Sequence, residues 1–212
     1  SHMQLLGKLV IKSKDKIIQF LNEEQTGRIS SIDKNGYPQI IPMNFVLINN
    51  TVYMHSHIRG EKLDNVKRNS KVGFEVDRNL EFLPSYFFDP NDASLADTLY
   101  ISVVIKGEAA IVSDSTEKAL ALNALMKKYQ PEGKYEPMRE NMQVLNEVVV
   151  IKIMPNQMNG KYKIGQNMSK QKRIELAENI LIRNSKTAQD TLEIMGFAIE
   201  SGKLVLKTDE EW

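Results

Sequence analysis

The chain has 212 residues, enough for one substantial domain with an appendage rather than two domains of equal size. Its 28 Lys and Arg against 27 Asp and Glu give a formal net charge of +1, so the composition predicts no general affinity for nucleic acid or anionic membranes. Cysteine is absent, which excludes disulfides, thiolate nucleophiles and zinc-thiolate sites and is compatible with a reducing cytosol.

The first residues and the apolar runs of the chain indicate where the protein is expected. Ser1, His2 and Met3 look like the remnant of an expression tag, so residues 1–3 are set apart from the fold. No apolar run reaches the roughly 18 residues of a membrane helix, and no charged leader with an apolar core precedes the first expected helix. We therefore expect a soluble, cytoplasmic protein that does not bind membranes.

Alternating apolar and polar residues, bounded by turn residues, predict an antiparallel sheet. The expected strands cover residues 28–33, 37–48, 51–57, 71–77, 99–112 and 147–154. An Asn35-Gly36 turn joins the first two strands, and Pro38 and Pro42 imply that the second strand lies at a sheet edge or contains a bulge. Gly107 interrupts the fifth strand.

Helical periodicity predicts helices over residues 14–22, over residues 61–69 and after Asp114, where Glu117 completes a capping box. Residues 78–97 form a long polar and aromatic connection that either borders a pocket or covers an open barrel end. Six closely spaced strands with few helical interruptions favour a closed antiparallel barrel with helical caps.

The composition changes to helix formers near Ser169. We expect a barrel domain over residues 4–167 and a helical C-terminal extension over residues 168–212. Two short apolar strands around Ser201-Gly202 predict a hairpin near the end of this extension.

The segment over residues 54–69 is the most informative part of the chain, because a strand ends there in a polar turn and a helix begins near Gly60. A helix start has unsatisfied N–H groups and the positive end of the helix dipole. Four side chains add donors or positive charge: Ser56, His57, Arg59 and Lys62. The segment is a candidate phosphate site, although a charged turn before an amphipathic helix is also common on protein surfaces.

Serine-hydrolase, dinucleotide-fingerprint, P-loop and metal sites have less support in the sequence. The sequence lacks a Gly-x-Ser-x-Gly elbow, a Gly-x-Gly-x-x-Gly fingerprint and a P-loop, and no further histidine or cysteine completes a metal site with His55 and His57. Pro42, Met43 and Asn44 on the adjacent strand are available to meet a flat ring. A phosphate and a flat ring together suit flavin mononucleotide (FMN).

Four segments follow one another as in the pyridoxamine-phosphate-oxidase-like flavin-binding split barrels: GRISSID, NGYPQIIPMNFV, VYMHSHIRGEKLDNVKRNSKVGFEVD and YISVVIKGEAAIV. The resemblance covers residues 14 to about 154 and is strongest to the 5-nitroimidazole resistance type. It implies a mainly β, α+β fold: a six-stranded antiparallel split β-barrel with capping helices, here followed by the helical extension.

The resemblance also implies a homodimer with one FMN in each of two clefts between the subunits. The cofactor-binding residues that it implies are Pro42, Met43, Asn44, Ser56, His57, Arg59, Lys62, Tyr100 and Ser102. The stretch KYKIGQNMSKQKR is similar to the Lys-x-x-Gln-Asn segment of flavin-binding regulators in the same superfamily, which adds Gln166 and Asn167. Those two residues are equally compatible with an ordinary turn.

The expected function is that of a flavin-dependent oxidoreductase, of the nitroimidazole-reductase or pyridoxamine-phosphate-oxidase kind. It would pass electrons from a reduced nicotinamide to a small planar acceptor, with His57 or His55 as the catalytic proton donor. Two alternatives stay open: a flavin-binding sensor or transcriptional regulator with little turnover, and a haem-binding or haem-degrading barrel. FAD, a deazaflavin or haem would then replace FMN.

Overall fold

The computed structural model describes residues 7–212, so the expected tag remnant lies outside the described residues. The contacts divide the chain into two compact units. The barrel unit comprises residues 14–76 and 103–159, and the described part of the tail unit comprises residues 7–13, 77–102 and 160–212. Each unit is described by itself below.

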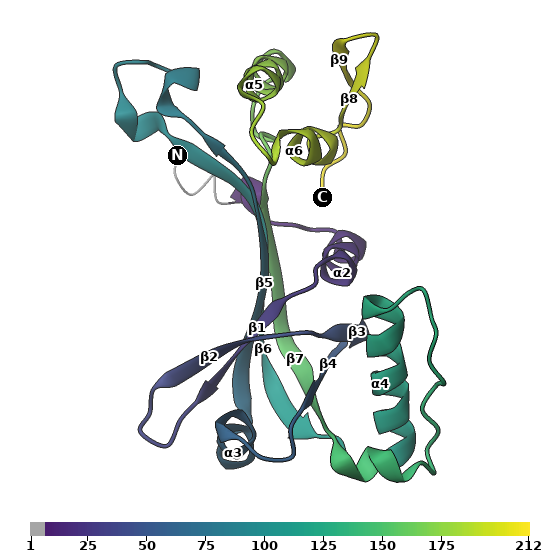
Figure 1. Ribbon diagram of the computed structural model, residues 1–212. Helices are drawn as coiled ribbons and strands as arrows, with labels where there is room; N and C mark the ends of the chain where they lie inside the picture. The colour runs from purple at the N-terminus through teal and green to yellow at the C-terminus, as the bar shows by residue number, and fades with distance from the viewer. Residues whose placement is uncertain (1–6) are drawn as a thin grey trace. The chain divides into compact units, whose positions relative to one another are not determined.

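A seven-stranded sheet is the main element (Figure 1). Its strands are β1 Gly27–Ile32, β2 Pro38–Met43, β3 Val46–Ile48, β4 Thr51–Ser56, β5 Lys71–Leu83, β6 Asp97–Ile111 and β7 Val149–Lys163. They lie in the order β2-β1-β5-β6-β7-β4-β3, and β1 pairs antiparallel with β2 and β5, as β4 does with β3 and β7. The predicted split β-barrel fold of the α+β class is confirmed.

The sheet closes through a very short connection. Strands β2 and β3 are its two opposite edges, yet only Asn44 and Phe45 separate them in the chain. Three Cα steps span roughly 11 Å at most, so the sheet must curl until its edges approach each other. The strand predicted over residues 37–48 is therefore two strands, which gives seven rather than six, and the predicted edge position of Pro38 and Pro42 is confirmed.

Three helices belong to the barrel unit: α2 Lys14–Glu23, α3 Glu61–Arg68 and α4 Ser115–Tyr129. All three were predicted. The Asp114 side chain caps α4 by accepting from the N–H of Glu117 at 3.0 Å. The carboxylate of Glu117 does not complete a reciprocal box, because it accepts from the Tyr53 hydroxyl at 2.7 Å and from Lys152 at 3.1 Å. Both contacts hold α4 against β4 and β7.

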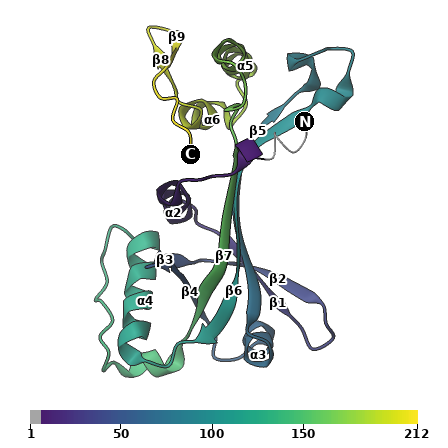
Figure 2. The ribbon, with the colours of Figure 1, turned by 180° about the vertical axis from the view of Figure 1, so that it is seen from behind.

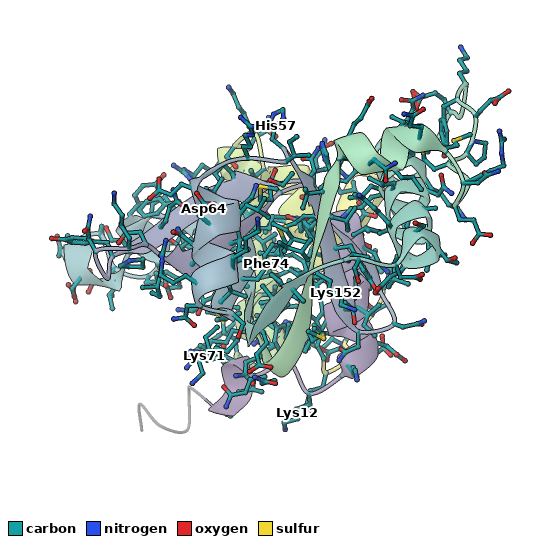
Figure 3. The ribbon with its side chains drawn as sticks, turned by 90° about the horizontal axis from the view of Figure 1, so that it is seen from below. Lys12, His57, Asp64, Lys71, Phe74 and Lys152 are labelled. Carbon is teal, nitrogen blue, oxygen red and sulfur yellow. The ribbon has the colours of Figure 1, made fainter. Side chains whose placement is uncertain are left out.

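The barrel core contains the inward-facing residues of the strands, and Figure 3 shows Phe74 of β5 in the middle of the packed side chains. Phe74 meets Phe45 edge to face, with ring centroids 5.2 Å apart. Outside the sheet, α4 packs on β3, β4 and β7 through buried side chains: Val46, Tyr53, Ala121, Leu125 and Val150. A 3₁₀ helix over Gln143–Glu147 precedes β7.

The connection predicted over residues 78–97 is shorter than expected. Strand β5 continues to Leu83 and β6 begins at Asp97, so residues 84–96 form the connection, which contains two 3₁₀ turns, Ser85–Phe87 and Ala93–Leu95. The charged residue Glu81 made this part of the sequence look like a loop, but in the structure it lies in β5 and is only 4% exposed. The Ser185 hydroxyl at 2.6 Å and the Thr187 hydroxyl at 3.0 Å donate to its carboxylate.

The rest of the tail unit follows the predicted order of two helices and a hairpin (Figure 2). These elements are α5 Lys170–Arg183, α6 Ala188–Ile194, β8 Phe197–Glu200 and β9 Lys203–Leu206. The indole of Trp212 stacks on Tyr162 with ring centroids 4.7 Å apart. In the part of the chain described here, every helix is too short or too polar to cross a membrane.

Candidate functional site

The start of α3 has no side-chain cap among the described residues. Strand β4 ends at Ser56, residues 57–60 form a turn, and α3 begins at Glu61. The residue before the helix, Gly60, has φ 151° and ψ 162°, a conformation that side chains disfavour. No side chain within residues 7–212 caps this helix, so the N–H groups of its first turn keep their capacity to bind an anion.

Lys62 provides a cation beside this helix start. Its ammonium donates to the Met43 sulfur at 3.3 Å, and the side chain is half-buried. Burial lowers the pKa of Lys62 below its ordinary value, and no carboxylate among the described residues opposes that effect. A thioether is only a weak acceptor, so the ammonium lacks a strong partner. An anionic ligand would supply one.

Helix α3 is fixed on the first two strands. The amide of Asn65, 1% exposed, donates to the Ser31 hydroxyl at 3.2 Å and to the Gln39 side-chain oxygen at 3.1 Å. Arg68 adds a donation to the Ile32 carbonyl at 3.3 Å. These bonds tie the middle and end of the helix to β1 and β2, so the position of Lys62 is set by the sheet.

The three residues expected to meet a flat ring lie at the end of β2 but do not share one face. Met43 points toward α3, as its contact with Lys62 shows. Pro42 precedes it on the strand and faces the opposite side, because side chains alternate along a strand. Asn44 is exposed in the connection to β3. The structure therefore brings Met43, of these three, to Lys62.

The polar residues at the end of β4 are accessible. Ser56 is half-buried opposite Val149, and His55 is exposed opposite Val150. His57 and Arg59 are exposed in the turn before α3, and Figure 3 shows His57 at the periphery of the view. Both imidazoles are therefore within reach of solvent and of a small ligand.

The remaining four candidates belong to the tail unit. Tyr100 and Ser102 are half-buried on one face of β6. The Gln166 amide closes a turn: its oxygen accepts from the N–H of Ile164 at 2.8 Å, and its nitrogen donates to the Lys8 and Tyr162 carbonyls. A pocket of this unit is lined by Gln166 and Asn167, together with Gly7, Lys8, Lys12, Tyr162, Asp209, Glu210 and Glu211. Neither Tyr100 nor Ser102 lines it.

Two residues near the site were not identified from the sequence. Lys128 and Tyr129, at the end of α4, contact the backbone of Phe45 between β2 and β3. Tyr129 follows Leu122, Leu125 and Met126 at helical spacing, and the partners of a tyrosine hydroxyl cannot be read from such an apolar stripe. The adjacent Lys127-Lys128 pair resembles the basic last turn of any helix.

The family model described as "Pyridoxamine 5'-phosphate oxidase" matches residues 13–162. The chain belongs to the pyridoxamine 5'-phosphate oxidase family. The match of this family spans the barrel unit, including the α3 start and the β2 end. No protein among those with curated functions matches the chain significantly.

Solved structures share the fold of this family member. A proposed 5-nitroimidazole antibiotic resistance protein from Bacteroides thetaiotaomicron is 24% identical with a TM-score of 0.60, covering 72% of this chain and 86% of that one. A flavocytochrome from Azotobacter vinelandii is 18% identical, with a TM-score of 0.62 over 73% and 69%. An FAD and heme binding protein from Mycobacterium smegmatis is 14% identical, with a TM-score of 0.61 over 71% of each chain.

Proposed function

We propose that this protein is a flavin-dependent oxidoreductase that binds FMN with its phosphate at the start of α3. One observation carries this proposal: the half-buried Lys62 ammonium has only a thioether partner and lies in the first turn of a helix that no described side chain caps. An ammonium, open N–H groups and the nearby Ser56 hydroxyl and Arg59 guanidinium form a donor set that fits a phosphate.

Family membership and the related structures support a flavin-type cofactor. The flavocytochrome and the FAD and heme binding protein share the fold of this chain. We choose FMN because the site has a single helix start and a single half-buried ammonium, which suit one phosphate monoester rather than the diphosphate of FAD. A bound flavin supplies hydride and one-electron transfer.

The residues of the chain would bind and orient the cofactor. Lys62 and the α3 start hold the phosphate, and the end of β2 at Met43 lies along the ring edge, whereas the side chain of Pro42 faces the other side of the strand. His57, or His55, donates a proton from its imidazole to the reduced acceptor. The electron donor that we propose is a reduced nicotinamide, and the acceptor is a small planar molecule.

We further propose that two copies of the chain associate and that both contribute to each flavin cleft. Large apolar side chains on the outer side of β2 and β6 support this, since Ile40 is 64% exposed and Val104 is 44% exposed. Light scattering should give twice the chain mass, and Ile40→Lys should give monomers. A monomeric wild-type protein at micromolar concentration would reject the dimer.

The absorption spectrum of the purified protein tests the cofactor. We expect the purified protein to show flavin bands, or, if it is colourless, to bind added FMN saturably. It should bind FMN more tightly than FAD, a deazaflavin or haem. Anaerobic addition of NADH or NADPH should then bleach the flavin. Bands of haem, or no binding of any of these compounds, would reject the FMN proposal. Tight FMN binding without bleaching by either nicotinamide would favour a sensor over an oxidoreductase.

A further inference from the structure

We infer that Lys128 and Tyr129 of α4 are positioning residues for the flavin site: they hold the backbone of Phe45 and thereby fix Met43 beside Lys62. The inference rests on the proposed function, because the group that is positioned is the proposed FMN site. Neither residue is expected to touch the flavin.

The backbone of Phe45 needs partners from outside the sheet. Phe45 lies in the connection between β2, which ends at Met43, and β3, which begins at Val46. The chain leaves one edge of the sheet here and joins the other, so the two polar groups of Phe45 fall outside the regular ladders. Buried backbone groups without partners cost free energy, so such a connection is stable only if other groups serve them.

The end of α4 provides these partners. The Tyr129 hydroxyl accepts from the Phe45 N–H at 2.8 Å, and its proton points to the Gln25 carbonyl at 2.7 Å or the Phe45 carbonyl at 3.1 Å. The Lys128 ammonium donates to the Phe45 carbonyl at 3.0 Å and to the Leu21 carbonyl at 3.2 Å. Both polar groups of Phe45 are thus bound by α4.

The side chain of Phe45 is held as firmly as its backbone. Its ring is fully buried, and the Lys128 ammonium lies 3.7 Å from the ring centroid. Burial lowers the pKa of Lys128 to about 8, and the negative charge of Glu24 opposes this effect in part. The ammonium therefore lies against the Phe45 ring and carbonyl although burial disfavours its charge.

The position of Phe45 determines that of Met43. Asn44 alone separates the two residues, so a shift of the Phe45 backbone moves the Met43 sulfur, which accepts a hydrogen bond from the Lys62 ammonium at 3.3 Å. The path therefore runs from α4 through Phe45 and Met43 to the cation expected to bind phosphate. Helix α4 acts on the site without contributing a ligand.

Tyr129→Phe removes one oxygen and Lys128→Met removes the ammonium while keeping an unbranched side chain; Lys127→Met, on the same helix at an exposed position, is the control. We expect each test variant to raise the FMN dissociation constant about tenfold and to shift the visible spectrum of bound FMN. Lys127→Met should leave both unchanged. In a double-mutant cycle with Lys62→Ala, the loss from Tyr129→Phe should be less than additive. Wild-type affinity and spectrum in both test variants, or full additivity, would overturn the inference.

A second measurement needs no flavin. In the protein without added cofactor, the NMR signal of the Met43 methyl group should move in Tyr129→Phe and Lys128→Met, and the Phe45 amide should exchange faster with solvent. An unmoved Met43 signal would overturn the positioning role even if the wild-type protein bound no FMN. A moved Met43 signal in a protein that never binds FMN would instead reject the proposed function alone.

Discussion

The Lys62 ammonium and the Met43 sulfur lie 3.3 Å apart, one on α3 and the other on the edge strand β2. This contact links the two segments that the sequence singled out for different parts of a ligand, the helix start for a phosphate and the strand end for a ring. An ammonium has three donors, so a phosphate that binds Lys62 would add a charge-assisted hydrogen bond to the weak contact with the sulfur.

Replacing Lys62 with alanine should therefore weaken FMN binding. The loss of a charge-assisted contact is worth about 1.5 to 3 kcal/mol, which corresponds to a dissociation constant raised about 10-fold to 150-fold. Fluorescence titration of FMN measures the change, and Lys67→Ala, at an exposed position of the same helix, is the matched control. Equal affinities of Lys62→Ala and Lys67→Ala would remove Lys62 from the phosphate site.

Asn65→Ala should destabilise the barrel unit, because the buried amide is the donor to both Ser31 and Gln39. We expect the free energy of unfolding to fall by about 1 to 3 kcal/mol, measured by urea denaturation. Asn69→Ala removes an exposed bond to the N–H of Lys71 and should cost less than about 1 kcal/mol. If Asn69→Ala lowered the free energy of unfolding more than Asn65→Ala does, Asn65 would not be the residue that anchors α3.

Two glycines of the sheet should respond differently to alanine. A Cβ at Gly107 would lie 2.5 Å from the Met154 carbonyl oxygen, which is backbone of β7 and cannot move aside. A Cβ at Gly73 would meet its nearest atoms at 3.7 and 3.9 Å, an ordinary contact. Gly107→Ala should lower the free energy of unfolding by about 1 to 3 kcal/mol, whereas Gly73→Ala should not lower it. Thermal melts of both variants decide the matter.

Lys128 should make stability depend on pH. Its pKa falls from 10.5 in the unfolded chain to about 8 in the folded protein, because of burial. Between these values the unfolded state binds more protons, so the free energy of unfolding rises with pH. Relative to Lys128→Met, the wild type should gain about 1 kcal/mol between pH 7 and pH 10, an amount already reduced for solvent screening. A difference between the two proteins that stays constant over this range would contradict the lowered pKa.

Local patterns predicted the elements of the barrel unit well. The Asn35-Gly36 turn forms with Asp33, whose carbonyl accepts from Gly36 at 3.0 Å, and Asp114 caps α4 as expected. Strand alternation in β5 also places Val72 and Phe74 in the core. Such features depend on neighbours along the chain, which the sequence shows directly.

Features that depend on distant partners were missed. The outer part of β5 looked like a polar loop, because the partners of the buried Glu81 carboxylate lie about a hundred residues later: the Ser185 and Thr187 hydroxyls and the Arg183 guanidinium. The break between β2 and β3 follows from the closure of the sheet, and the roles of Lys128 and Tyr129 follow from that break. Of the candidate site, the start of α3 was predicted and its contact with Met43 was observed, whereas the opposed orientations of Pro42 and Met43 were not foreseen.

The two-residue connection between β2 and β3 has a consequence for how this protein can change. A loop of ordinary length tolerates a deletion, but here the loss of one residue would leave two Cα steps, about 7.6 Å at most, to join the two edge strands. One strand would have to slip by a residue, which turns its side chains to the other face, so shortening at this point should abolish the fold before it alters ligand preference. New ligand specificities would have to arise by substitutions that leave the length of this connection unchanged.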